Sequence, residues 1–185
     1  DPLFKDVVVY SSILILLSIG LTLSYLTTKV PNFAHGSFAT MGAYLSLISV
    51  KMFKSNPYSA MPFAFIISGL LAFGLYYLVL KPLIKKNASH LIQMVATLAY
   101  DLILIAIINI LSDSLSRTYK ITSREFTLRS YDLVVSDLSL VVIIAPLCAI
   151  IIISSLWFTL TKTKFGIAMR ATIENPNLSS VLGIN

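Results

Sequence analysis

The chain has 185 residues, of which 57% are apolar and 12% are charged, and its mean hydropathy is +0.87. Soluble domains are about 45–50% apolar and about 25% charged, so this composition indicates a membrane protein. The single cysteine excludes a disulfide framework and a cysteine-rich metal cluster. The net charge of +6 fits loops beside anionic lipid headgroups better than it fits nucleic-acid binding.

Five apolar runs are each long enough to cross a bilayer, which requires about 20 residues of helix. They cover residues 7–28, 33–53, 59–80, 91–111 and 138–160. The runs are continuously apolar, whereas a strand of a membrane barrel has about 10 residues of alternating polarity. The sequence therefore predicts an all-α fold, a polytopic transmembrane bundle of about five spanning helices within residues 1–161.

Short polar segments separate these runs. Between the first two, Pro31 lacks a backbone N–H and biases Val30 away from helix, which predicts a tight turn or a broken helix start. We expect the other connections at residues 54–58, 81–90 and 112–137, followed by a polar tail at residues 161–185.

The distribution of basic residues leaves the orientation open. Cytoplasmic loops of membrane proteins carry an excess of Lys and Arg. Here the 14 Lys and Arg residues divide evenly between the two sides of the predicted bundle. The orientation has to come from another observation.

Asp101 lies near the middle of the fourth apolar run, where a carboxylate costs several kcal/mol unless it faces a cavity or a partner. Steps of four residues predict a polar stripe of Gln93, Thr97, Asp101 and Asn109 on one helix face. In one interpretation this stripe lines a water-accessible path or a ligand site. In the other, Asp101 is protonated or hydrogen-bonds to a Ser, Thr or Tyr of a neighbouring helix.

Other polar residues in the membrane have simpler explanations. Close helix packing accounts for a weak polar face on the first run, made of Ser11, Ser18, Thr22 and Tyr25. His35 has no other ligand at metal-binding spacing, so we expect no metal site. The sequence offers no nucleophile, base and orienting group for an enzyme and no phosphate-binding loop, so nucleotide chemistry is expected on another chain.

The polar tail contains the pattern of a short helix. Asn175 is a suitable N-cap, Pro176 fits a first helical turn, and Gly183 can end the helix in a left-handed conformation. These signals predict a helix at residues 176–182. A helix this short is marginal in water, so we expect it to lean on the membrane domain or on a partner. A solvated loop or an interfacial helix is the alternative.

Three blocks of sequence carry a resemblance to a known family. The first is Asn-Phe-Ala-His-Gly at 32–36 with Met-Gly-Ala-Tyr at 41–44, and the second is Lys-Pro-Leu at 81–83 leading into Ala-Thr-Leu at 96–98. The third is Thr-Lys-Phe-Gly-Ile-Ala-Met-Arg-Ala at 163–171, followed by Gly-Ile-Asn at 183–185. Over nearly its whole length the chain resembles the permease subunits of branched-chain amino acid ABC transporters.

The resemblance implies a multi-pass subunit of the cell (plasma) membrane, embedded in the lipid bilayer, with a cytoplasmic C-terminal tail. It implies three kinds of partner: a second, homologous permease subunit, two cytoplasmic ATPase subunits and an external substrate-binding protein. ATP belongs to the partner subunits, and no cofactor is expected on this chain. Residues 162–185 are then a coupling loop and short helix that docks on the ATPase through Gly166, Arg170, Ala171, Glu174, Asn175, Pro176 and Gly183.

The resemblance also implies the cargo, which is branched-chain or similar small amino acids. The candidate substrate pathway consists of Asn32, His35, Gly36, Ser37, Gln93, Thr97 and Asp101. Ala99 and Asp101 stand where the family is expected to have glycine and small or apolar residues, which questions a neutral aliphatic substrate. Similar permeases carry amides or urea, and these remain alternatives. Such permeases also continue beyond a point equivalent to Asn185, so we expect the chain to be a fragment.

Two other functions remain open. An ion-coupled carrier or channel would use the titration of Asp101, because the polar stripe can carry water or protons. A non-transporting structural subunit of a larger membrane complex is the other. Co-purification with ATPase subunits would discriminate among these possibilities.

Overall fold

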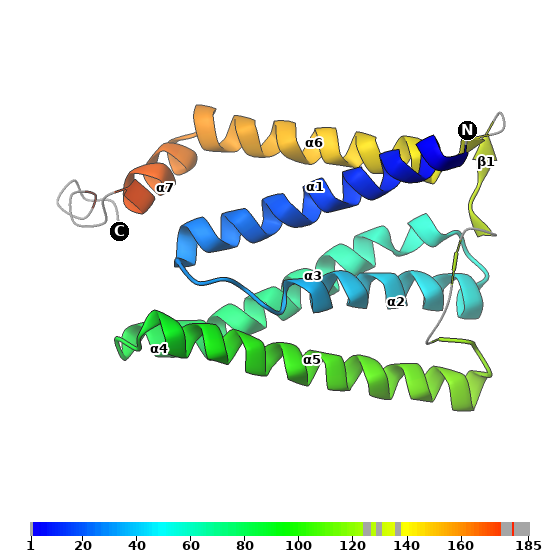
Figure 1. Cartoon of the computed structure of the whole chain (residues 1–185), viewed down its shortest axis with the longest axis horizontal. Helices are drawn as coiled ribbons and strands as arrows, with labels where there is room; N and C mark the ends of the chain where they lie inside the picture. Colours follow the sequence, from blue (N-terminus) through cyan, green and yellow to red (C-terminus); the bar gives the residue numbers. More distant parts are fainter. Residues whose placement is uncertain (1, 124–126, 129–130, 136–137, 175–178, 180–185) are drawn as a thin grey trace. The chain divides into compact units, whose positions relative to one another are not determined.

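The computed structural model describes residues 2–123, 127–128, 131–135, 138–174 and 179. Helices dominate this part of the chain (Figure 1). In chain order the elements are α1 (Pro2–Thr28), α2 (His35–Phe53), the 3₁₀ helix η1 (Pro57–Ala60), α3 (Met61–Gly74), the π-helix η2 (Leu75–Leu80), α4 (Lys81–Lys85), α5 (His90–Tyr119), the strands β1 (Val134–Val135) and β2 (Leu138–Ser139), α6 (Val141–Lys162) and α7 (Lys164–Glu174). The all-α prediction is confirmed, since each strand is only two residues long.

The chain divides into two compact units. One combines Asp1–Thr27 with Leu138–Asn185, and the other is Thr28–Asp137. The first unit therefore contains α1, α6 and α7. The second contains α2, α3, α5 and the short helices between them.

Four helical stretches are long and apolar enough to cross a membrane: Leu3–Thr28, Pro57–Lys85, His90–Tyr119 and Val141–Lys162. They cover the first, third, fourth and fifth predicted spans. The second predicted span is also helical, as α2, whose 19 residues measure about 28 Å along the axis and so match the hydrocarbon thickness. α2 packs against α3, η1 and α5 of its own unit, and its buried residues include the polar Ser37 as well as apolar residues.

The core of the second unit lies where α2 packs on α5 and on the α3–η2 helix. In Figure 1, α2, α3 and α5 run lengthwise beside one another. Since lipid tails are as apolar as these side chains, close packing and hydrogen bonding hold such helices together. One buried cluster joins Ala34, Phe38, Leu75, Leu80 and Leu104, and a second joins Met41, Tyr44, Leu47, Ile108 and Leu115.

Several helices extend further than the predicted apolar runs. The predicted loop at 112–137 starts too early, because α5 continues to Tyr119 and contains Asp113 and Arg117. The predicted connection at 81–90 likewise starts too early, because α4 continues to Lys85. Charged residues mark where a helix leaves the hydrocarbon, but a helix with satisfied backbone hydrogen bonds continues into the interface. Hydropathy therefore identified the apolar stretches and missed the helix ends.

Candidate functional site

The polar residues predicted inside the membrane meet where the start of α2 faces α5. Ser37 Oγ donates a hydrogen bond of 2.5 Å to Asp101 Oδ1. Ser37 is buried and Asp101 is half-buried. A hydroxyl on the neighbouring helix is the partner that the inter-helix interpretation of Asp101 requires, so Asp101 joins two helices whatever else it does.

Thr97 fastens α5 to the segment before α2. Its side chain is 1% exposed, and its Oγ1 lies 3.2 Å from the carbonyl oxygen of Pro31 and 2.8 Å from that of Met94. Proline's neighbours lack regular helical hydrogen bonding at this break, so the Pro31 carbonyl needs a donor from outside its own segment. Thr97 supplies that donor from one helical turn before Asp101.

Gln93 lies one further turn toward the start of α5. It is 5% exposed, and its Nε2 donates a 2.9 Å hydrogen bond to the carbonyl oxygen of Ala88. This bond closes the turn that precedes α5, where Ser89 Oγ also accepts from the N–H of Ile92. Gln93 thus belongs to the same buried face as Thr97 but binds its own connection rather than α2.

The Asn-Phe-Ala-His-Gly block forms the turn that starts α2. Asn32 Oδ1 accepts from the N–H of Ala34 at 3.1 Å, and the N–H of His35 donates to the carbonyl of Asn32 at 3.4 Å. Asparagine favours such turns because its side chain imitates a backbone carbonyl. A Cβ added at Gly36 would meet no described atom within 4 Å. The described chain therefore leaves open space beside Gly36, next to the Ser37–Asp101 pair.

One member of the predicted stripe lies elsewhere. Asn109 and Ile105 are exposed, whereas the buried face of α5 continues through Leu104, Ile108 and Ser112. A helix has 3.6 residues per turn, so each step of four advances about 40° around the axis. Over the four steps from Gln93 to Asn109 this drift places Asn109 on nearly the opposite side. The prediction that Asn109 shares the stripe is wrong.

A second polar cluster, which was not predicted from the sequence, lies at the far end of the α2–α5 contact. Ser123 Oγ donates to the carbonyl of Ser112 at 2.7 Å and lies 2.7 Å from Ser116 Oγ. Tyr44 Oη of α2 donates to the Ser123 carbonyl at 2.9 Å. Serines at positions 112 and 116, one turn apart, were the available signal, but their partner Ser123 lies beyond the helix end. This serine cluster binds the chain after α5 back onto both helices.

Two further contacts hold the same connection to the end of α2 and to η1. Lys51 Nζ donates to Tyr131 Oη at 2.7 Å and lies 4.6 Å from the centre of that ring. Tyr58 Oη donates to the carboxylate of Asp132. The described residues of the connection after α5 are thus bound to α2, η1 and α5 of the same unit.

The polar tail begins with a helix that the sequence analysis did not predict. α7 starts after Thr163, whose Oγ1 accepts from the N–H of Gly166 at 3.1 Å in the manner of an N-cap. Gly166 is buried, and a Cβ there would lie 2.1 Å from the carbonyl oxygen of Thr159 and 2.5 Å from Leu160 Cα. Any side chain at position 166 would therefore collide with the last turns of α6.

The predicted coupling residues fall partly on α7. Gly166 packs against α6, Ala171 is half-buried, and Arg170 and Glu174 are exposed. Asn175, Pro176 and Gly183, and with them the predicted helix at 176–182, lie outside the described residues. The structure thus brings Asn32, Gly36 and Ser37 near Thr97 and Asp101 in one unit, and gathers the first coupling residues in the other.

The first unit also has an open apolar hollow of about 300 Å³ between α1 and α6. Ser18 and Thr22 of the predicted weak polar face line it. On the same helix Ser12, rather than Ser11, is buried, and its Oγ donates to the carbonyl of Val8. The other lining residues are Ile19, Leu23, Ile153, Leu156 and Leu160.

Comparison with known proteins gives consistent results. The family described as "Branched-chain amino acid transport system / permease component" matches residues 3–185. A protein of Methanocaldococcus jannaschii named "Probable branched-chain amino acid transport permease protein LivH" is 41% identical over 183 residues, which make up 99% of this chain and 58% of that protein. The chain therefore spans less than two thirds of the length of this relative. No solved structure gives a significant match.

Proposed function

Because the chain belongs to the branched-chain amino acid transport permease family, we propose that it is a membrane-spanning part of an ABC importer for branched-chain or similar small amino acids. The observation that carries this proposal is the family match over residues 3–185. In the proposed assembly a second permease subunit completes the pathway, and an external binding protein delivers the substrate. Two cytoplasmic ATPase subunits bind ATP and drive the cycle.

The proposed substrate pathway passes the start of α2 and the facing turn of α5. An amino acid carries an ammonium and a carboxylate, and it needs one partner of each sign inside the membrane. The carboxylate of Asp101 suits the ammonium group, because a carboxylate has room for more acceptor bonds than the one it makes with Ser37. The first turn of α2 carries the positive end of a helix dipole, which suits the carboxylate.

This arrangement also gives the remaining candidate residues a role. Asn32 and His35 form the turn that starts α2, and Gly36 leaves space beside it. Thr97 holds α5 against that turn through a hydrogen bond to the Pro31 carbonyl, and Gln93 closes the turn that precedes α5. In the proposal Asp101 and the first turn of α2 contact substrate, while Asn32, Thr97 and Gln93 position them.

The coupling role is proposed for the tail. ATP binding closes the ATPase subunits, α7 and the residues after it receive that motion, and the bundle changes its opening as a rigid body. Arg170 and Glu174 are exposed on α7 and can form ion pairs with an ATPase surface. This assignment places the tail in the cytoplasm.

The test of the proposed function uses the complete permease, reconstituted with its partner subunits in vesicles. Uptake of radiolabelled leucine is compared for the native chain, Asp101→Asn and the exposed-face control Asn109→Ala. A charge-assisted hydrogen bond contributes about 1.5–3 kcal/mol, so Asp101→Asn should weaken transport about 10- to 100-fold. Asn109→Ala should transport normally.

Each rival function predicts a different result. Uptake by the permease alone, independent of ATP and abolished in Asp101→Asn, would indicate an ion-coupled carrier. Preserved uptake in Asp101→Asn would remove Asp101 from the substrate pathway. Transport of amides or urea that survives Asp101→Asn would indicate a neutral substrate, because these molecules have no ammonium for the carboxylate to bind.

A further inference from the structure

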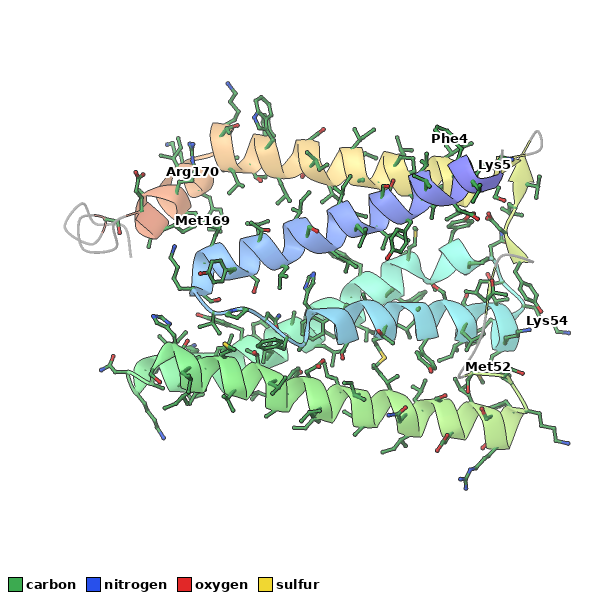
Figure 2. The ribbon with its side chains drawn as sticks, in the orientation of Figure 1. Phe4, Lys5, Met52, Lys54, Met169 and Arg170 are labelled. Carbon is green, nitrogen blue, oxygen red and sulfur yellow. The ribbon has the colours of Figure 1, made fainter. Side chains whose placement is uncertain are left out.

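α7 has two unlike faces. At about 100° per residue, its apolar face combines Phe165, Ala168, Met169, Thr172 and Ile173. Lys164, Arg170 and Glu174 lie around the opposite side, together with the exposed Ile167. Figure 2 labels Met169 and Arg170, which leave the helix on different sides. Phe165 is 75% exposed, so the described chain leaves the apolar face uncovered at its start.

The residues at the end of α6 indicate the depth in the membrane at which α7 begins. Lys162 Nζ lies 5.9 Å from the centre of the Trp157 ring, a distance at which a cation is attracted to the ring face. Tryptophan and lysine at the end of a spanning helix are typical of the boundary between hydrocarbon and water. Phe165 follows Lys162 by three residues, so the first turn of α7 lies at the depth of the lipid headgroups.

The connection between the two helices fixes the direction of α7. The Thr163 hydroxyl is held between the two helices, since it donates to the Thr159 carbonyl at 2.5 Å and accepts from the N–H of Gly166. Gly166 packs on the backbone of Thr159 and Leu160. In Figure 1, α7 turns away from the axis of α6. A helix that bends away from the axis of a spanning helix in this way can lie along the membrane surface instead of continuing straight into water.

We propose that α7 is an interfacial helix, with Phe165, Met169 and Ile173 in the boundary between headgroups and acyl chains of the bilayer. The surface of α6 that it continues is itself apolar and exposed, with Trp157 60% and Phe158 57% exposed. Lys162 and Lys164 add positive charge that suits anionic headgroups. The inference deepens the proposed coupling role, because it leaves the side with Arg170 and Glu174 turned toward the ATPase.

The test measures the depth of single positions along α7 in the full permease. Cys148 is replaced by Ala, and single cysteines at positions 164, 165 and 167 to 174 carry a nitroxide spin label. The labelled protein is reconstituted without ATPase subunits into phosphatidylcholine–phosphatidylglycerol vesicles. Collision rates with oxygen, which concentrates in lipid, and with a water-soluble nickel complex are measured for each label. Phe165→Cys and Ile167→Cys form the matched pair, because both native side chains are exposed and they lie about 200° apart on the helix.

The proposal expects oxygen collisions to exceed nickel collisions at positions 165, 169 and 173, and the reverse at 167, 170 and 174. The ratio of the two rates should therefore oscillate with a period near 3.6 residues. Nickel access all around the helix would mean that α7 lies in water, and low access of both reagents at 165 would mean that protein covers this face. Either result overturns the proposal. Since no ATPase is present, neither result bears on coupling, which the uptake assay measures separately.

Discussion

Among single residues, Gly166 is a position with no room for a side chain. Gly166→Ala would place a Cβ 2.1 Å from the Thr159 carbonyl oxygen, so α7 must move relative to α6. We expect this variant to lose about 1–3 kcal/mol of stability and most of its uptake. Gly69→Ala is the matched control, because no described atom lies within 4 Å of a Cβ there and alanine favours the α3 helix by about 1 kcal/mol. Thermal unfolding in detergent compares the two, and equal stabilities would contradict the steric argument.

Thr97 provides a second prediction for a single side chain. Thr97→Val keeps the shape of the residue but removes the hydroxyl near the Pro31 carbonyl. The partly buried Pro31 carbonyl then lacks this donor, which should cost about 1–3 kcal/mol. Thr40→Val removes a hydroxyl that bonds the Gly36 carbonyl within an exposed part of α2, and its cost should be within about 0.5 kcal/mol. A similar loss in both variants would show that Thr97 has no special role in joining α5 to the start of α2.

Some of these single-residue features could be predicted from the sequence. A carboxylate in an apolar run needs a partner, and a hydroxyl on a neighbouring helix was one of the expected partners of Asp101. The position of Asn109 could not be predicted correctly from steps of four, because small angular errors accumulate along a helix. The steric role of Gly166 depends on how α7 crosses α6, which a local sequence pattern does not contain.

At the scale of elements, α7 is the segment that should decide coupling. Arg170→Ala and Glu174→Ala remove exposed charges without disturbing a buried contact. We expect either variant to keep a folded permease and to reduce uptake at least about tenfold while the ATPase subunits still hydrolyse ATP, since about 1.4 kcal/mol of lost docking energy has that effect. ATP hydrolysis and leucine uptake are measured in the same vesicles. Thr172→Ala, an exposed position on the other side of α7, is the control.

Coupled uptake in both charge variants would refute the docking role of this side of α7. A parallel loss of folded protein would instead mean that the charges stabilise the permease. Measuring the amount of monodisperse protein before reconstitution separates these two results.

Elements were predicted more reliably than their ends. Long apolar runs require helices, because in lipid each backbone N–H and C=O needs a partner within its own segment. Hydropathy is silent about helices that continue into the interface, as α5 does to Tyr119. It also missed α7, because this helix is amphipathic rather than apolar and starts at a threonine cap that is easily taken for loop sequence.

For the second unit taken as a whole, the hydrogen bonds at the two ends of the α2–α5 contact should act independently. Thr97→Val affects one end, and Tyr44→Phe removes the donor to the Ser123 carbonyl at the other. Residues 97 and 112 are separated by about 22 Å of helix, and effects of changes this far apart usually add. The double variant should therefore lose the sum of the two single losses in unfolding free energy. A much smaller loss would mean that breaking one end already frees the other.

Two separate groups of hydrogen bonds between α2 and α5 restrict how these two helices can move. A helix that is bound to its neighbour at one point can rotate about that point. A helix that is bound at two separate points can rotate or slide only if one of these hydrogen bonds breaks. Ser37, Asp101 and Thr97 hold α2 and α5 together near the start of α2, and Tyr44 and Ser123 hold them near the middle of α2 and the end of α5. In the proposed importer, α2 and α5 should therefore move together, and the helices that separate during the transport cycle should be others.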